Sequence, residues 1–156
     1  MALPKYLLLN NVAECIERMT SSFKIGISEA RKAGLVPICV GHTPDESPPD
    51  HIVILESTPG GVMGQLPEAV DLMIQVIARG TTHFTARDFA WEVYTDIHEK
   101  CCHNLEYSES AAADEAFVTI DAIGSPAWIG LDEKGRHQFS CNYQFSYRNP
   151  SGGGGF

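Results

Sequence analysis

The chain lacks the sequence features of membrane-spanning and secreted proteins. Its apolar runs all fall short of the roughly 18–20 residues that a membrane-spanning helix needs. The segment MALPKYLLLN at the start holds too short an apolar stretch for a secretory signal, and it has no small-residue cleavage site. We therefore expect no membrane anchor and no leader peptide.

Disulfide patterns are missing too. The five cysteines are Cys15, Cys39, Cys101, Cys102 and Cys141, an odd number without the spacing of a disulfide framework or a zinc ribbon. Unpaired thiols are typical of reducing compartments. The sequence therefore predicts a protein that is made and assembled inside a cell.

Positive charge is scarce. The chain has 11 lysines and arginines against 20 aspartates and glutamates, which gives a formal net charge of −9. A protein that grips nucleic acid needs a positive stripe to neutralise phosphates. The charge therefore argues against binding of nucleic acid, but it allows a DNA passage whose repulsive wall prevents sticking.

The length and the hydrophobic content indicate one domain. A chain of 156 residues, of which 44% are hydrophobic, can bury its own core and is too short for two domains of common size. We expect a single domain over residues 1–150. The segment SGGGGF, residues 151–156, is predicted to be a flexible glycine-rich tail.

Sequence signals for catalysis are weak. There is no Gly-x-Ser-x-Gly elbow, and Gly60, Gly61 and Gly64 do not form a phosphate-binding loop. Cys39 and Cys141 could act as nucleophiles, but both lie in predicted strands at positions that suit a small buried residue. Carboxylates that could pair as acid and base, or hold a cation, are typical of solvated loops instead: Asp45, Glu46, Asp50, Asp121, Asp132 and Glu133. We predict no catalytic residue and no cofactor.

One cluster could bind a metal. It comprises His98, Cys101, Cys102 and His103, and on a helix His98 would lie one turn from a cysteine. Adjacent cysteines point in different directions, however, and no second ligand pair stands at finger-like spacing. We predict no metal site. A small metal-binding enzyme or ligand-binding domain remains the alternative, which stoichiometric zinc in the purified protein would support.

The first third of the chain predicts a helix followed by two strands. Apolar residues spaced by three or four predict one helix from Lys5 to Ala33 with Gly34 after its end, or a helix that breaks near Thr20. Leu35–Val40 is predicted as an edge strand because Pro37 has no N–H to donate. A loop over Gly41–Asp50 then leads to a buried strand at His51–Ser57.

The remainder predicts one more helix and three longer strands. After a glycine-rich connection at Thr58–Pro67, strict alternation predicts a strand at Val70–Arg79. A helix is predicted from Thr82 or Thr85 to Lys100, with Thr85 and Asp88 resembling a capping box. Beyond a loop at Cys102–Glu115, the turn Asp132–Gly135 would join strands at Phe117–Leu131 and Arg136–Arg148. The second of these alternates, with Phe139, Cys141, Tyr143, Phe145 and Tyr147 on its buried side.

The fold class is therefore α/β, more strictly α+β. We expect a mixed, largely antiparallel sheet of about four to five strands with two helices packed on one face.

Several motifs, taken in order, resemble a known family. Pro48-Pro49-Asp50 leads into HIVILES and the TPGG turn, and LMIQVIARG leads into the helix ARDFAWEVYTDIH. The segment IGLDEKGRHQFSCNYQF supplies a strand, an acidic turn ending in glycine and a final strand with Asn-Tyr. Over residues 48–148 this arrangement is similar to the phage minor-capsid and tail-terminator family.

The resemblance implies a structural virion protein with a fold similar to that of siphophage tail terminators. Six copies would form a ring on the head-proximal end of the tail tube and stop its polymerisation. The partners would be further copies of the chain, the tail-tube protein and a neck or head-completion (stopper) protein. DNA would pass through the lumen unread, and assembly would occur in the host cytoplasm. A neck adaptor, head-completion or minor tail protein is the alternative.

A closed ring needs a heterologous interface, in which two different patches of each subunit meet. Because each subunit carries a charge of −9, basic residues must face acidic ones at these contacts. Candidate interface residues are Arg79, Arg87, Arg136 and Arg148.

Overall fold

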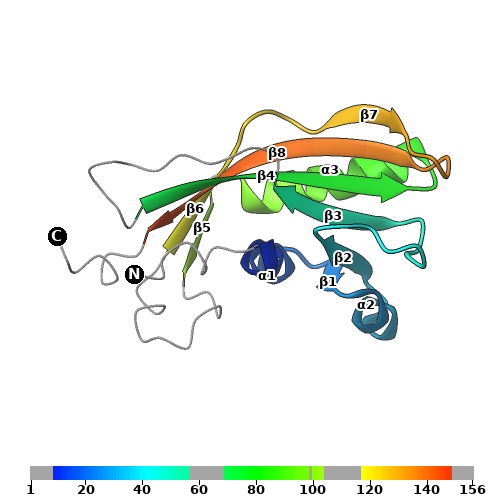
Figure 1. The fold of residues 1–156 in the computed structure, drawn as a ribbon, viewed down its shortest axis with the longest axis horizontal. Helices are drawn as coiled ribbons and strands as arrows, with labels where there is room; N and C mark the ends of the chain where they lie inside the picture. The colour runs from blue at the N-terminus through cyan, green and yellow to red at the C-terminus, as the bar shows by residue number, and fades with distance from the viewer. Residues whose placement is uncertain (1–8, 57–68, 99, 104–116, 149–156) are drawn as a thin grey trace.

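The fold is an α+β arrangement of eight strands and three helices in the part of the chain that the structure describes (Figure 1). This computed structural model describes residues 9–56, 69–98, 100–103 and 117–148. The helices are α1 (Leu9–Met19), α2 (Ile27–Ala33) and α3 (His83–Ile97). The strands are β1 (Phe23–Ile25), β2 (Val36–Val40), β3 (His51–Glu56), β4 (Ala69–Gly80), β5 (Lys100–His103), β6 (Phe117–Ala122), β7 (Ala127–Leu131) and β8 (His137–Arg148). The predicted fold class is confirmed, with more strands and helices than expected.

The sheet is mixed, as predicted. Its strand order is β1-β2-β3-β4-β8-β6-β5, and β7 also pairs with β8. The first three strands are parallel and every other pairing is antiparallel. Strand β4 pairs with β8 from Ala69–Arg148 to Gly80–His137, so these two strands form the longest pairing of the sheet.

The predicted strand at Phe117–Leu131 is wrong as a single element. It consists of β6 and β7, which pair one after the other along the same edge of β8. The break falls at Gly124, Ser125 and Pro126, where the proline has no N–H for a ladder. The predicted turn at Asp132–Gly135 is confirmed, because Gly135 N donates to Asp132 O at 3.0 Å.

The prediction that Pro37 marks an edge strand is also wrong. Strand β2 lies between β1 and β3. Val36 N donates to Ser22 O at 2.8 Å and Ile38 O accepts from Gly26 N at 3.2 Å, so residues 36 and 38 face β1 and Pro37 faces β3. Pairing with β3 begins only at Ile38 and Ile52. The missing N–H therefore falls just before that ladder and breaks no bond in it.

The N-terminal third follows the alternative with a break near Thr20. Helix α1 ends at Met19, and the hydroxyl of Thr20 donates to Ile16 O at 2.7 Å. A short strand and a second helix then follow, and neither was predicted separately. Gly34 ends α2 with φ 70°, the left-handed conformation that favours glycine, as predicted.

The start of α3 matches the predicted alternative at Thr82, but its end differs from the prediction. Thr82 rather than Thr85 caps the helix, since its Oγ1 accepts from Thr85 N at 3.1 Å. The helix ends at Ile97 because His98 is extended, and Lys100–His103 belongs to strand β5. The predicted loop over Cys102–Glu115 is thus partly strand, and residues 104–116 lie outside the described part. So do the connection at Thr58–Pro67 and the tail at 151–156.

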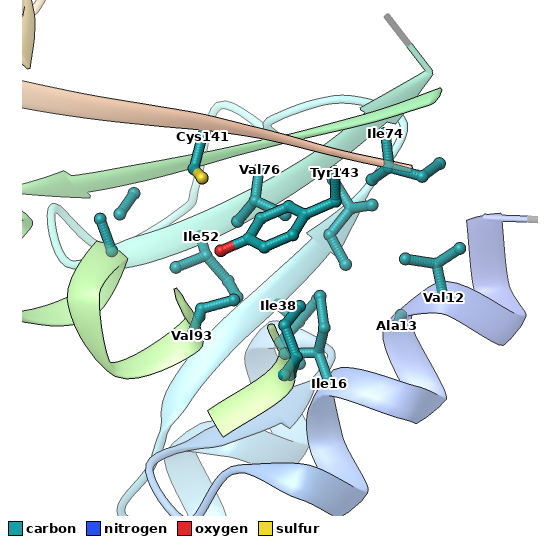
Figure 2. Packing of buried hydrophobic residues seen from close by; sticks show 14 of the residues in the cluster. Val12, Ala13, Ile16, Ile38, Ile52, Ile74, Val76, Val93, Cys141 and Tyr143 are labelled. Atoms are coloured by element: carbon teal, nitrogen blue, oxygen red, sulfur yellow. The ribbon is translucent and has the colours of Figure 1, made fainter. Parts of the chain in front are cut away.

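One face of the sheet packs against α1 and α3 and contains the main core (Figure 2). Phe139, Cys141, Tyr143 and Phe145 point into this core from β8, as their alternation predicted. Figure 2 shows the Tyr143 ring beside Val76 and Ile52, with Val93 of α3 opposite. Helix α2 differs, because its Ile27 packs with Cys39, Val53 and Ile77 on the other face. Beyond α2, that face carries the polar residues described below.

Gly80 allows α3 to start immediately after β4. A Cβ at this position would lie 2.8 Å from Ala86 N and 3.1 Å from Thr85 Cβ. We expect Gly80→Ala to lower the free energy of unfolding by about 2 kcal/mol, because neither the helix backbone nor Thr85 can move away freely. Urea unfolding of the two proteins measures this difference.

Gly124→Ala is the matched control. Nothing lies within 4 Å of the added Cβ at Gly124. We expect its stability to stay within about 0.5 kcal/mol of wild type. Equal effects of the two substitutions would contradict the close approach at Gly80.

Candidate functional site

An ion cluster of Arg79, Asp132 and Arg136 lies on the polar face of the sheet. The Asp132 carboxylate accepts from Arg136 Nε at 2.6 Å and lies 3.6 Å from Arg79 Nε. The side chains of the three residues are only 11–15% exposed. One carboxylate therefore serves two largely buried cations.

Further hydrogen bonds fix both sides of this cluster. Arg79 donates to Gln138 Oε1 at 2.8 Å and to Thr43 Oγ1 at 2.6 Å. Asp132 Oδ1 accepts from Lys134 N at 3.0 Å and from Arg136 N at 2.8 Å. The cluster thus ties the loop at residues 41–50 and the turn after β7 to strands β4 and β8.

The cluster borders an open cavity of about 560 Å³. Three of the predicted carboxylates meet in its lining, namely Asp45, Asp132 and Glu133. Two others lie elsewhere: Asp50 accepts from Thr81 N at 3.1 Å, and Asp121 is exposed on β6. Asp132, the carboxylate nearest the cavity's two arginines, is held by them and by the turn. The structure therefore gives it a supporting role in the fold.

The pKa values of Asp132 and of His51, which lies beside the ion cluster, are both shifted. Burial alone would raise the pKa of Asp132, but hydrogen bonds from the backbone and guanidinium of Arg136 hold it below its usual value. Burial lowers the pKa of His51 to about 4. His51 Nδ1 donates to Pro48 O at 2.8 Å, and Nε2 faces Arg79 Nη1 at 3.4 Å, so the neutral ring accepts from the arginine. At neutral pH the site thus contains an anionic Asp132 and a neutral His51.

The shift at His51 predicts acid sensitivity. The unfolded chain binds a proton at His51 below pH 6.5, whereas the folded chain does so only near pH 4. The free energy of unfolding therefore decreases as the pH is lowered from 6.5 to 4. When the pH is lowered from 7 to 5, protonation linked to His51 decreases the free energy of unfolding by about 2 kcal/mol. His51→Asn keeps an N–H near the position of Nδ1 and does not titrate. We expect urea unfolding of this variant to show that much less pH dependence than wild type, and an unchanged dependence would contradict the assignment.

The two candidate nucleophiles are buried. Cys39 packs with Val53 and Ile77, and Cys141 Sγ donates to Gly124 O at 3.2 Å. Burial raises the pKa of both thiols. The reactive thiolate is therefore disfavoured at each position, as expected for cysteines that fill a core.

The candidate metal cluster does not lie on one helix, so the predicted helical spacing is wrong. His98 ends α3, while Cys101, Cys102 and His103 belong to β5, and the side chains of those three fall outside the description. His98 Nδ1 accepts from Ala122 N at 3.0 Å, and its ring stacks on Tyr94. Among the side chains that the structure describes, no group of three or more His, Cys, Asp or Glu could hold a metal.

The four candidate interface arginines have different surroundings. Arg79 and Arg136 belong to the ion cluster, whereas Arg87 is exposed on α3 with its guanidinium 5.6 Å from the centre of the Trp91 ring. Arg148 ends β8, and its side chain is not described. Their role at an interface stays a prediction.

The most conspicuous surface feature is an apolar edge that the sequence did not predict. Trp128, Ile129 and Leu131 of β7 are 51%, 49% and 56% exposed, and Phe84 at the start of α3 is 73% exposed. His83 joins the two elements, because its ring lies 5.5 Å from Phe84 and 6.2 Å from Trp128. Such a patch on one edge is typical of a protein interface. The sequence AWIGL contained a signal for this exposure. A strand with one solvent-exposed face alternates apolar and polar residues, whereas AWIGL has adjacent apolar residues.

The chain matches a family model over residues 28–149, and the model describes a bacteriophage tail terminator protein. No curated protein matches the chain. No helix in the described ranges is long and apolar enough to cross a membrane. The family match covers both the polar face and the apolar edge. The chain therefore belongs to the bacteriophage tail terminator family, which makes it a structural protein of the phage tail.

Proposed function

We propose that this protein forms a hexameric ring on the head-proximal end of the tail tube. The ring stops tube polymerisation and offers the attachment surface for the neck or head-completion protein. DNA passes through its lumen without specific binding. The role is structural and not enzymatic, and the ring assembles in the host cytoplasm.

The observation that carries this proposal is the apolar edge in a member of the tail terminator family. Four large apolar side chains, at positions 84, 128, 129 and 131, are 49–73% exposed on one subunit. Exposed patches of this kind favour a protein that works in an assembly. The ion cluster next to the edge fits the same role, because it holds the end of β7 in a defined position.

Neighbouring positions in the particle are the second candidate. A neck adaptor, head-completion or minor tail protein would also need exposed assembly surfaces. Only its place in the virion separates such a protein from a terminator.

Disruption of the gene in its phage tests the proposal. Negative-stain electron microscopy of the lysate should show over-length or ragged tails beside filled heads without tails. Tails of normal length that fail to join heads would move the role to the neck. Intact, infectious particles would contradict both roles.

A further inference from the structure

The apolar edge is matched by an apolar recess on the other side of the same subunit. The recess, here the α2–β2 pocket, has a volume of about 320 Å³. Apolar side chains form most of its lining, with Arg31 and Asp50 beside them: Ile27, Leu35, Val36, Pro37 and Pro48. Such a recess can accept a large apolar side chain, which the apolar edge presents.

The two features lie towards opposite ends of the sheet (Figure 1). Strands β3, β4 and β8 separate β2 from β7. One subunit therefore cannot insert its own edge into its own recess, but a neighbouring copy can. A contact between two different patches is heterologous, and it continues from copy to copy until a ring closes.

The outer edge of β1, at the other end of the sheet, is partly bonded within the subunit. Ile25 N at the outer edge of β1 donates to Glu17 Oε2 at 2.8 Å, and Lys24 Nζ lies 3.6 Å from the same carboxylate. One backbone donor of this short strand is thus already used within the subunit. A neighbour approaching this side also meets the α2–β2 pocket.

Charge also favours a second copy as the occupant. Helix α2 ends with Arg31, which lines the pocket, and Lys32, whose Nζ lies 3.8 Å from Glu29 Oε1 of the same helix, in a chain with a net charge of −9. The strand that carries Trp128 and Leu131 runs into a turn in which Asp132 is held by Arg79 and Arg136, while Glu133 is exposed. A head-to-tail contact therefore brings Glu133 of one copy towards Arg31 of the next.

We propose that the apolar edge of each subunit, led by Trp128, inserts into the α2–β2 pocket of the next copy. This inference rests on the proposed ring and names the two surfaces that build it. Six such contacts close the ring, and each subunit uses its edge once and its pocket once.

Photo-crosslinking in the assembled particle tests the inference. The photoreactive amino acid p-benzoylphenylalanine replaces Trp128, and a plasmid supplies this chain to phage whose own gene is disrupted. Irradiated particles should yield a covalent dimer of the chain, with the crosslink between position 128 and residues 27–37 or 48–50. The same amino acid at Thr95, which is exposed on α3 and outside both surfaces, should not crosslink to those segments.

Each other outcome has a definite meaning. Three outcomes would overturn the inference and leave the terminator role intact. Position 128 could crosslink to the tail-tube or neck protein, or to position 128 of another copy. It could also give no product in particles that contain the chain. Particles made with the unsubstituted chain that lack it altogether would instead contradict the proposed function.

Discussion

Asp132→Asn should lower the free energy of unfolding by about 3 kcal/mol. The amide keeps an acceptor for Lys134 N and Arg136 N, so the turn can form. It loses the charge between Arg79 and Arg136, and its NH₂ group would face donors on both guanidiniums. Two largely buried cations then lie close together without a counterion, which is the costly way to break a buried ion pair. Chemical denaturation at neutral pH measures the loss.

Glu133→Gln is the control for this substitution. Glu133 is the adjacent residue in the same turn and is exposed. It loses the same charge, but we expect its stability to change by less than about 0.5 kcal/mol. If Asp132→Asn lowered the free energy of unfolding as little as Glu133→Gln, the ion cluster would contribute little to the stability of the fold.

Trp128→Asp should abolish plaque formation while the subunit still folds. Trp128 is half exposed on an edge strand, so we expect the free energy of unfolding to change by less than about 1 kcal/mol. A central aromatic side chain of an interface contributes about 2 kcal/mol or more, and the proposed six-fold ring would repeat this contact six times. Plasmid complementation of a phage with a disrupted gene measures the titre, and thermal unfolding of the purified variant measures its stability.

Thr95→Asp is the matched control, because it places the same charge at an exposed site on α3 away from the apolar edge. It should complement as well as wild type. A fully infectious Trp128→Asp phage would contradict a role of the apolar edge in assembly. A variant that failed to fold would be replaced by Trp128→Ser, for which the same loss of titre is expected.

Elements with strong periodic patterns could be predicted from the sequence. The alternation over Val70–Arg79 gave β4, and that over Arg136–Arg148 gave β8 together with its buried side. Pattern alone could not divide Phe117–Leu131, because both of its parts pair with the same edge of β8. Nor could it place Pro37 inside the sheet, since this depends on where the ladder between β2 and β3 begins.

The functional surfaces were harder to predict than the fold. Composition suggested Arg79 and Arg136 as interface residues, and the structure shows both held by Asp132 of the same subunit. The apolar edge escaped prediction because a stretch such as AWIGL is equally typical of a buried strand. Its exposure follows from topology: β7 pairs with β8 alone among the described strands.

The most direct test of the account is a cryo-electron microscopy reconstruction of the virion at the junction between head and tail. We predict six copies of this chain in one ring, stacked on the last layer of the tail tube and below the neck protein. A reconstruction that placed the chain elsewhere in the particle, or at the junction in an arrangement other than a six-fold ring, would contradict it.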